Sequence, residues 1–179
     1  MPASVEERAR RVRLLTCDVD GVLTDGRIYV DDQGHEFKAF SALDGVGLNL
    51  LARAGIAIAW ITGSAAPAVA HRARHLGIAH LIQDTSDKLA AWERLRTQLQ
   101  LPSDAVAHIG DDLPDLPVLA ACGLAATVPH APDAVKANAH YVTRREGGAG
   151  AVREVAELIL VARGLYGELS EHGAVGVRA

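Results

Sequence analysis

Three short apolar runs in this sequence each end in polar residues and glycine. The runs cover residues 12–16, 56–61 and 105–109, and they lead into Asp18-Val19-Asp20-Gly21, Thr62-Gly63-Ser64 and Gly110-Asp111-Asp112. A continuous apolar run of this length is typical of a parallel strand that is covered on both faces of its sheet. The chain is therefore expected to form a sheet whose strands end at a polar site.

Helical patterns alternate with strands along the rest of the chain. Helices are expected at residues 6–11, 67–76, 87–99, 116–121, 132–137 and 151–163, and further strands at 80–82, 124–128 and 140–142. Another helix is expected to start with Asp44 as its cap and to stop at Gly55. This alternation predicts an α/β fold, a doubly wound, Rossmann-like parallel sheet with helices on both faces. Ligands bind outside the carboxyl ends of the strands in such sheets, so the three polar clusters should meet at one edge.

One segment departs from the alternation. Residues 28–30 and 36–40 flank the polar turn Asp31-Asp32-Gln33-Gly34, which predicts a β-hairpin over about residues 27–40. The length of 179 residues suits one domain, residues 1–179, and leaves little room for a second. Residues from about 165 to 179 have little apolar periodicity and are expected to form a mobile tail.

Composition narrows the possible functions. The net charge of −4 gives no electrostatic reason to expect nucleic acid as a partner. Residues 1–13 contain no apolar stretch of signal-peptide length, and no run approaches the ~20 residues that span a bilayer, so no membrane partner is expected. Cys17 and Cys122 lie in apolar segments and should be buried free thiols, which fits the cytoplasm.

Asp18 and Asp20 point to phosphate chemistry. Two carboxylates two residues apart on an extended segment point to the same side and repel each other, and Mg²⁺ binds carboxylate oxygens well. A solvated acidic turn is the alternative for this pair alone. Together with Asp111, the pair could hold one Mg²⁺, while the Thr62 hydroxyl and the Lys88 ammonium group bind a phosphoryl group. Lys88 lies near the start of its helix, where the helix dipole does not favour a cation, so a functional placement is preferred to a solvated lysine.

The ordered motifs resemble those of the haloacid dehalogenase superfamily of phosphatases. Residues 18–25 resemble the first motif, residues 61–63 the second, Lys88 the third and residues 110–115 the fourth. Within the superfamily, residues 25–29, 38–40, 44–47 and 141–154 resemble the capless phosphatases of 2-keto sugar acid phosphates. The resemblance covers about residues 14–160.

The resemblance implies a role for each matching residue. Asp18 would be the nucleophile and Asp20 the general acid and base. The Asp18 side chain, the Asp20 backbone carbonyl and Asp111 would hold Mg²⁺, with Asp112 and Asp115 in outer positions. Substrate binding is expected of Thr62, Gly63, Arg72, Lys88, Asp44 and Gly45. For Arg72, a solvated helix-face position is an equal alternative.

The resemblance also implies a substrate and an assembly. A Mg²⁺-dependent phosphatase is expected to hydrolyse a small phosphorylated sugar acid through an aspartyl-phosphate, first of all 3-deoxy-D-manno-octulosonate 8-phosphate in lipopolysaccharide precursor synthesis. Ser64 departs from this pattern, because arginine is usual there and glutamate occurs in nonulosonate phosphatases. A nine-carbon 2-keto sugar acid phosphate is therefore the second choice. Capless relatives are homotetramers, and a homotetramer is expected here in preference to a monomer.

One alternative of a different functional class shares part of this residue pattern. Receiver domains of signalling proteins also combine aspartates with a hydroxyl and a lysine, so a phospho-switch is the alternative of a different class. Such domains lack a second acid that corresponds to Asp20, and they lack a hairpin after the phospho-acceptor.

The eight histidines, His108 among them, show no metal-ligand spacing and are expected at the surface or at strand ends.

Overall fold

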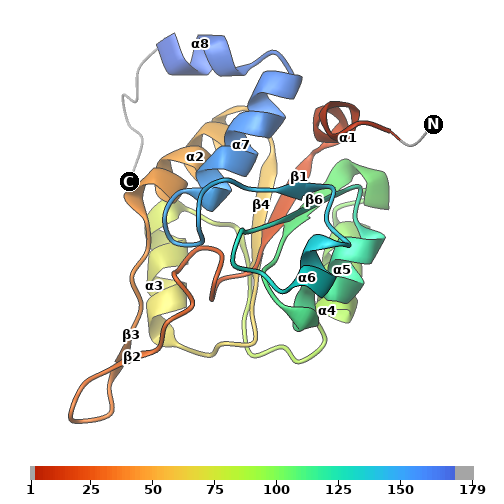
Figure 1. Ribbon diagram of the computed structural model, residues 1–179. Helices are drawn as coiled ribbons and strands as arrows, with labels where there is room; N and C mark the ends of the chain where they lie inside the picture. The colour runs from red at the N-terminus through yellow and green to blue at the C-terminus, as the bar shows by residue number, and fades with distance from the viewer. Residues whose placement is uncertain (1–2, 172–179) are drawn as a thin grey trace.

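Six parallel strands form the central sheet, in the order β5-β4-β1-β6-β7-β8. A computed structural model of the chain describes residues 3–171 (Figure 1). The strands are β1 (Leu14–Cys17), β4 (Ala57–Ile61), β5 (His80–Ile82), β6 (Val106–Ile109), β7 (Leu124–Thr127) and β8 (Tyr141–Val142). In β1, Cys17 pairs with Trp60 of β4 on one side and with Ile109 of β6 on the other. The predicted parallel sheet is confirmed, and its strands end within about two residues of the expected positions.

Helices cover both faces of this sheet, as a doubly wound fold requires (Figure 1). One face carries α1 (Val5–Arg11), α2 (Ala42–Arg53), α3 (Pro67–Leu76) and α7 (Ala151–Ala162). The other carries α4 (Lys88–Gln98), α5 (Leu116–Ala121) and α6 (Asp133–Lys136), together with the short turn η2 (Leu113–Asp115). A second short turn, η1 (Ser103–Ala105), directly precedes β6 and contacts α1. Among residues 3–171, no helix combines the length and the apolar character needed to cross a bilayer.

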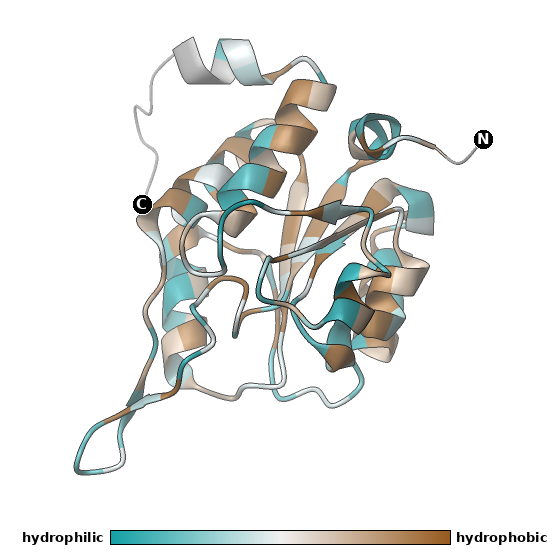
Figure 2. Ribbon diagram, in the orientation of Figure 1, coloured by the Kyte–Doolittle hydropathy of each residue, from teal (hydrophilic) through white to brown (hydrophobic). Residues whose placement is uncertain are grey.

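The core lies between the sheet and these two helical layers. Every residue of β1, β6 and β7 is buried, and Figure 2 shows the apolar strands and the apolar inner sides of the helices. Helix α7 contributes Val152, Val155 and Ile159, which recur at helical spacing and are fully buried. The predicted tail begins with α8 (Tyr166–Glu171), and residues 172–179 lie outside the described residues.

The predicted hairpin forms, but its strands are much shorter than expected. Strands β2 (Tyr29–Val30) and β3 (Glu36–Phe37) have two residues each, and the hairpin projects away from the body of the molecule (Figure 1). Tyr29 and Phe37 stack on each other, with ring centroids 5.2 Å apart. Phe40, beyond β3, instead stacks on Trp60 of the core. The ladder is short because the segment leaves the hairpin before residue 40 to join the core.

Asp44 does not cap its own helix, so that prediction is wrong. Ser41 is the N-cap of α2, and its hydroxyl oxygen accepts the N–H of Leu43. Asp44 lies in the first turn of α2, is almost fully buried, and accepts the N–H of Arg153 at 2.8 Å through Oδ1. Helix α7 begins after Gly150, which has no side chain that could accept its free N–H groups. Asp44 supplies that acceptor from the neighbouring helix.

Asp44 makes stability depend on pH. Burial raises its pKa from 3.8 to about 6, although N–H groups of Arg153, Gly150 and Val152 act in the opposite direction. Between these values the folded state holds a proton that the unfolded state has lost, so stability falls as pH rises through this window. We expect the difference in free energy of unfolding between Asp44→Asn and the wild type to shift by about 2 kcal/mol in favour of the variant as pH rises from about 4.5 to 7. Urea unfolding at both pH values measures this, and a pH-independent difference would contradict it.

Candidate active site

The carboxyl ends of β1, β4 and β6 meet at one edge of the sheet, where they open into a cavity of about 460 Å³. Asp18 directly follows β1, Thr62 follows β4, and Asp111 lies just beyond β6. The parallel topology of the sheet therefore brings together side chains that are far apart in the sequence. The cavity is lined by Asp18, Asp20, Gly26, Thr62, Gly63, Ser64, Thr85, Ser86, Lys88, Asp111, Asp112, Pro114 and Asp115.

Lys88 is held between two buried carboxylates. Its Nζ atom lies 2.8 Å from Oδ1 of Asp18 and 2.7 Å from Oδ1 of Asp115. Burial lowers the pKa of Lys88, but the charges of Asp18 and Asp115 outweigh burial and raise it. Lys88 is the first residue of α4, and Asp87 caps that helix through the N–H of Ala90. The lysine is thus a fixed positive charge at the floor of the cavity and not a solvated side chain.

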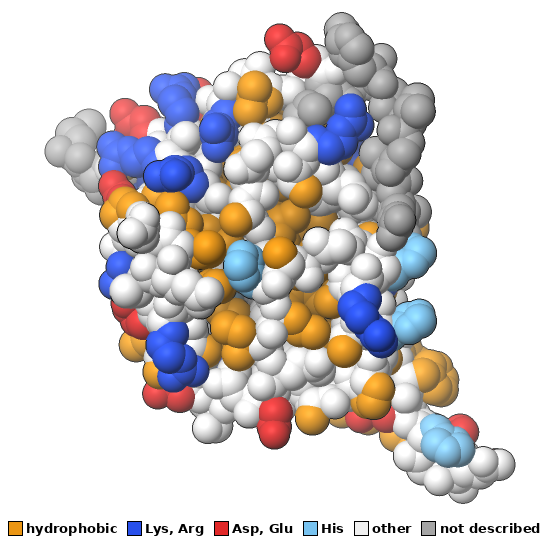
Figure 3. Space-filling model, turned by 180° about the vertical axis from the view of Figure 1, so that it is seen from behind, with side chains coloured by type: hydrophobic (Ala, Val, Ile, Leu, Met, Phe, Trp, Pro, Cys, Tyr) orange, Lys and Arg blue, Asp and Glu red, His pale blue; other side chains and the backbone are white. Residues whose placement is uncertain are grey.

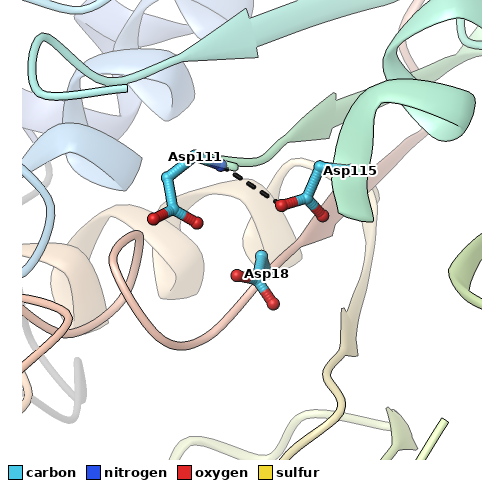
Figure 4. A group of neighbouring side chains, drawn as sticks. All are labelled: Asp18, Asp111 and Asp115. Atoms are coloured by element: carbon cyan, nitrogen blue, oxygen red, sulfur yellow. Dashed lines mark hydrogen bonds between the residues drawn. The ribbon is translucent and has the colours of Figure 1, made fainter. Parts of the chain in front are cut away.

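Three carboxylates converge beside this lysine. Oxygen atoms of Asp18, Asp111 and Asp115 lie within 4.8 Å of one another, and Figure 4 shows the three side chains gathered in one place. Burial and the Asp115 charge raise the pKa of Asp18 to about 7 and that of Asp111 to about 6. Two neighbouring acids with raised pKa values indicate that the site holds more negative charge than Lys88 offsets. The site therefore fits a divalent cation with oxygen ligands.

Asp115 differs from the other two acids in its hydrogen-bond partners and in its pKa. Its Oδ1 faces Nζ of Lys88 and Nε2 of His108, while its Oδ2 accepts the N–H of Asp111 at 3.3 Å (Figure 4). Burial raises the pKa of Asp115, but the hydrogen bonds from His108 and Lys88 outweigh it and lower the value to about 2. Both oxygens of Asp115 are thus engaged by protein groups.

Close glycine contacts shape the loop that carries Asp18 and Asp20. Gly21 has φ +89°, and a Cβ atom there would lie 2.0 Å from Oδ2 of Asp111. Gly147 packs so tightly that its Cβ would lie 1.8 Å from the carbonyl oxygen of Gly21. A side chain at either position would push Asp111 or the loop out of place. The glycine-rich segment 147–150 therefore supports the site of its own chain.

Asp20 points to a partner on the hairpin. Its Oδ1 accepts a hydrogen bond of 2.6 Å from Nζ of Lys38, which also pairs with Oε1 of Glu36 at 2.8 Å. The Lys38 side chain is only 4% exposed, so this pair is well defined. Asp20 is consequently oriented by a lysine, whereas Asp18 faces Lys88 and Asp111. Sequence reasoning quoted Lys38 only as part of a motif and missed this contact.

Thr62 and Ser64 form the turn that follows β4. Oγ1 of Thr62 accepts the N–H of Ser64 at 3.0 Å, which leaves the hydroxyl hydrogen available for an oxygen atom of a ligand. Oγ of Ser64 accepts the N–H of Ala66 at 3.2 Å. Asp112 is exposed and caps η2 through the N–H of Leu113, so it contributes to the rim of the cavity.

Three predicted substrate residues lie elsewhere. Asp44, Gly45 and Arg72 line a second, much smaller hollow beside Phe40 and Trp60, and they do not line the large cavity. Coulombic attraction from Asp44 acts on Arg72, whose pKa burial lowers. The described chain thus brings the phosphate-binding and metal-binding candidates together, and it separates them from these three.

His108 does not lie at the surface. Its side chain is fully buried in β6, one residue before the strand ends, next to Thr16 of β1. Its ring nitrogens contact Oγ1 of Thr16 at 2.9 Å and Oδ1 of Asp115 at 3.2 Å. The only signal in the sequence was a polar residue at a position that an apolar strand would fill. That signal identifies no partner, because Asp115 and Thr16 become neighbours only in the folded sheet.

Comparisons with known proteins point to one family of enzymes. Residues 60–154 match the family described as haloacid dehalogenase-like hydrolase. The 3-deoxy-D-manno-octulosonate 8-phosphate phosphatase of Yersinia pestis is 51% identical over 159 residues, which are 89% of this chain and 85% of that protein.

Solved structures show the same similarity. The phosphatase of that name from Moraxella catarrhalis, in complex with magnesium ion, phosphate ion and KDO, has a TM-score of 0.91 and 40% identity and covers 94% of this chain and 98% of that one. The cobalt-bound enzyme from Haemophilus influenzae has a TM-score of 0.85 and 37% identity, covering 88% and 92%.

Proposed function

This chain belongs to the haloacid dehalogenase-like hydrolases, within their group of 3-deoxy-D-manno-octulosonate 8-phosphate phosphatases, and we propose that it hydrolyses that phosphate ester to the free sugar acid and phosphate. The observation that carries the proposal is Asp18, a buried carboxylate beside Lys88 and Asp111 in an open cavity. The product would enter lipopolysaccharide precursor synthesis. The expected resemblance and enzyme class are confirmed, and the relatives give no support to a phospho-switch.

Asp18 would be the residue that attacks phosphorus. Its ion pair with Lys88 favours the charged form of the carboxylate, against the burial and the Asp115 charge that raise its pKa to about 7. An acyl-phosphate on Asp18 would divide one difficult displacement into two easier ones. Lys88, the Thr62 hydroxyl and the backbone N–H groups around Gly63 would bind the oxygens of the transferring phosphoryl group. These donors offset the charge that spreads over those oxygens during transfer.

Asp20 would move the protons. Its contact with Lys38 orients the carboxyl group on the rim of the cavity, away from the Asp18–Asp111–Asp115 cluster. From that position it can protonate the leaving alkoxide and then accept a proton from the attacking water. These different partners support the division of labour that we propose for Asp18 and Asp20.

Mg²⁺ is the cofactor that this site and its relatives support. Side chains of Asp18 and Asp111 and the backbone carbonyl of Asp20 would hold the ion, with Asp112 and Asp115 outside them. When bound, the ion neutralises charge that develops on the phosphoryl oxygens. Lys88 remains necessary beside the ion, because it balances the Asp115 charge from within the protein.

Metal dependence tests the enzyme class directly. We expect turnover of an aryl phosphate such as p-nitrophenyl phosphate in Mg²⁺, loss of activity after chelation with EDTA, and full recovery on adding Mg²⁺ back. The liberated phenolate is measured by absorbance. Unchanged activity in chelator would contradict a role for the metal, and a single phosphorylation without turnover would favour the phospho-switch.

Substrate length is tested with a panel of 2-keto sugar acid phosphates. We expect the highest kcat/KM for the eight-carbon 8-phosphate and a lower value for the nine-carbon 9-phosphate, as measured by phosphate release. Ser64 lines the cavity and departs from the pattern of the octulosonate phosphatases, so it is the residue to vary if the order is reversed. Asp44, Gly45 and Arg72 would contact sugar only if closure or a partner subunit extended the cavity toward them.

The assembly that we propose is a homotetramer. The hairpin exposes Ile28, Val30 and Phe37 by 72%, 56% and 54%, and it stands out from the body of the molecule (Figure 3). A hairpin is marginally stable in water by itself, so burial of these side chains between subunits would stabilise it.

We propose the cytoplasm as the compartment of this protein. Cys17 and Cys122 are buried free thiols, which supports a reducing environment.

The hairpin makes the assembly testable. We expect light scattering to give a mass of about four chains for the wild type and a smaller mass for the double variant Ile28→Ser/Phe37→Ser, because the apolar contact is lost. Val161→Ser, which removes a comparably exposed apolar side chain from α7, is the matched control and should leave the mass unchanged. A one-chain mass for the wild type at micromolar concentration would contradict the tetramer.

A further inference from the structure

A buried polar pair crosses the centre of the sheet. Thr16 of β1 and His108 of β6 are register partners, and both are fully buried among apolar strand residues. Burial of polar groups costs free energy unless hydrogen bonds replace those made with water. An apolar pair would pack here without that cost. The pair therefore needs a reason in the contacts that it makes.

The hydrogen bonds of His108 lead to the active site. Nδ1 lies 2.9 Å from Oγ1 of Thr16, and Nε2 lies 3.2 Å from Oδ1 of Asp115. Oγ1 of Thr16 is also 3.0 Å from the carbonyl oxygen of Ala107. The Thr16 hydroxyl donates either to Nδ1 or to that carbonyl. In both arrangements Nε2 carries hydrogen, because its partner Asp115 is an ionised carboxylate and can only accept.

We propose that His108 is a positioning residue for phosphoryl transfer, which holds the Asp115 carboxylate through Nε2–H so that Asp115 keeps Lys88 against Asp18. The proposal rests on the phosphatase function above. Asp115 joins three parts of the site, namely Lys88, His108 and the N–H of Asp111. His108 anchors that junction to the rigid centre of the sheet.

The location of Asp115 explains why it needs an anchor. Its oxygens lie within 4.8 Å of oxygens of Asp18 and Asp111, the proposed metal ligands. A carboxylate that lost the His108 bond could turn toward the metal position and take Lys88 with it. With Nε2–H in place, Asp115 stays outside the metal shell and Lys88 stays on the nucleophile. Partners of this kind commonly change activity or metal affinity by about 10–100-fold when they are removed.

Substitutions at His108 test the donor itself. We expect His108→Leu to lower kcat for the octulosonate 8-phosphate by about 10–100-fold and to change KM by less than about two-fold. His108→Gln should recover most of kcat, because its amide N–H can reach the position of Nε2–H. Val106→Ala, in the same buried strand, is the control: it lowers stability through a cavity and should leave kcat unchanged.

Thr16 provides a second test that barely changes volume. We expect Thr16→Val, which removes the hydroxyl, to lower kcat several-fold, and Thr16→Ser, which keeps it, to behave like the wild type. Melting temperatures of all variants show whether they fold. If His108→Leu fails to fold, the Val and Ser pair and the His108→Gln variant still decide the proposal.

A spectroscopic measurement on the wild type is independent of activity. In ¹⁵N NMR of the imidazole groups, we expect His108 to show a protonated Nε2 whose hydrogen exchanges slowly, because the ring is fully buried. An unprotonated Nε2 would overturn the proposal, as would a folded His108→Leu variant with wild-type kcat. Failure of the proposed function would look different, since the wild type itself would then not hydrolyse the sugar phosphate.

Discussion

Asp18→Asn is expected to lower kcat by at least about 10⁴-fold, because an amide cannot form the acyl-phosphate on which the reaction depends. The measurement is phosphate release from octulosonate 8-phosphate in saturating Mg²⁺. Asp133→Asn makes the same chemical change at an exposed position in the first turn of α6 and should retain full activity. Near-normal turnover in the Asp18 variant would contradict the assignment of Asp18 as the nucleophile.

The same variant should remain folded. Burial and the Asp115 charge raise the pKa of Asp18 to about 7, so the ionised carboxylate is held in a site that resists its charge. Asparagine removes this repulsion, while Lys88 keeps Asp115 as its partner at 2.7 Å. We therefore expect a melting temperature at least equal to that of the wild type. An inactive but folded protein separates a chemical loss from a structural one.

Lys88→Met should be costly in both activity and stability. Loss of the ammonium group removes a donor to the phosphoryl oxygens, which lowers kcat by about 10²–10³-fold. It also leaves Asp18 and Asp115 without their shared cation, and breaking a buried pair in this way costs about 3–5 kcal/mol. Kinetics with octulosonate 8-phosphate and urea unfolding measure the two effects. Lys136→Met, in the last turn of α6 and outside the lining of the cavity, is the control.

The stability cost in Lys88→Met should grow with pH. Without Lys88, whose charge lowers the pKa of Asp18, that pKa rises beyond about 7. Between about pH 7 and that higher pKa, the folded variant still holds a proton that the folded wild type and the unfolded chain have both released, so the stability of the variant falls relative to the wild type in this window. A stability difference that shrank from pH 6 to pH 8 would contradict the role of Lys88 as the counter-charge of the two carboxylates.

Much of the fold and site could be predicted from local patterns. Apolar runs and helical spacing indicated the strands and helices, and the ends of β1, β4 and β6 identified Asp18, Thr62 and Asp111. The carboxyl ends of neighbouring strands in a parallel doubly wound sheet meet at one edge, so this topology predicts that the three residues lie close together. Lys88 was predictable because a cation at the start of a helix opposes the dipole.

Other residues could not be assigned in this way. Asp44 has the pattern of a cap for its own helix, yet it accepts the N–H of Arg153 at the start of α7. Lys38 lies in a hairpin without visible periodicity, and its contact with Asp20 depends on how that hairpin folds back. His108 was expected at the surface or at a strand end, and its burial against Thr16 and Asp115 could not be predicted. Each case concerns a side chain whose partner is distant in the sequence.

The sequence by itself determined the sheet, the chemistry of its edge and the family, because periodicity and motif order are local and survive without coordinates. The tertiary structure alone decided which group each acid contacts. Asp18 faces Lys88, Asp20 faces Lys38, and Asp115 is tied to His108. Identical carboxylates differ only in their surroundings, and packing creates those surroundings from segments that meet when the chain folds.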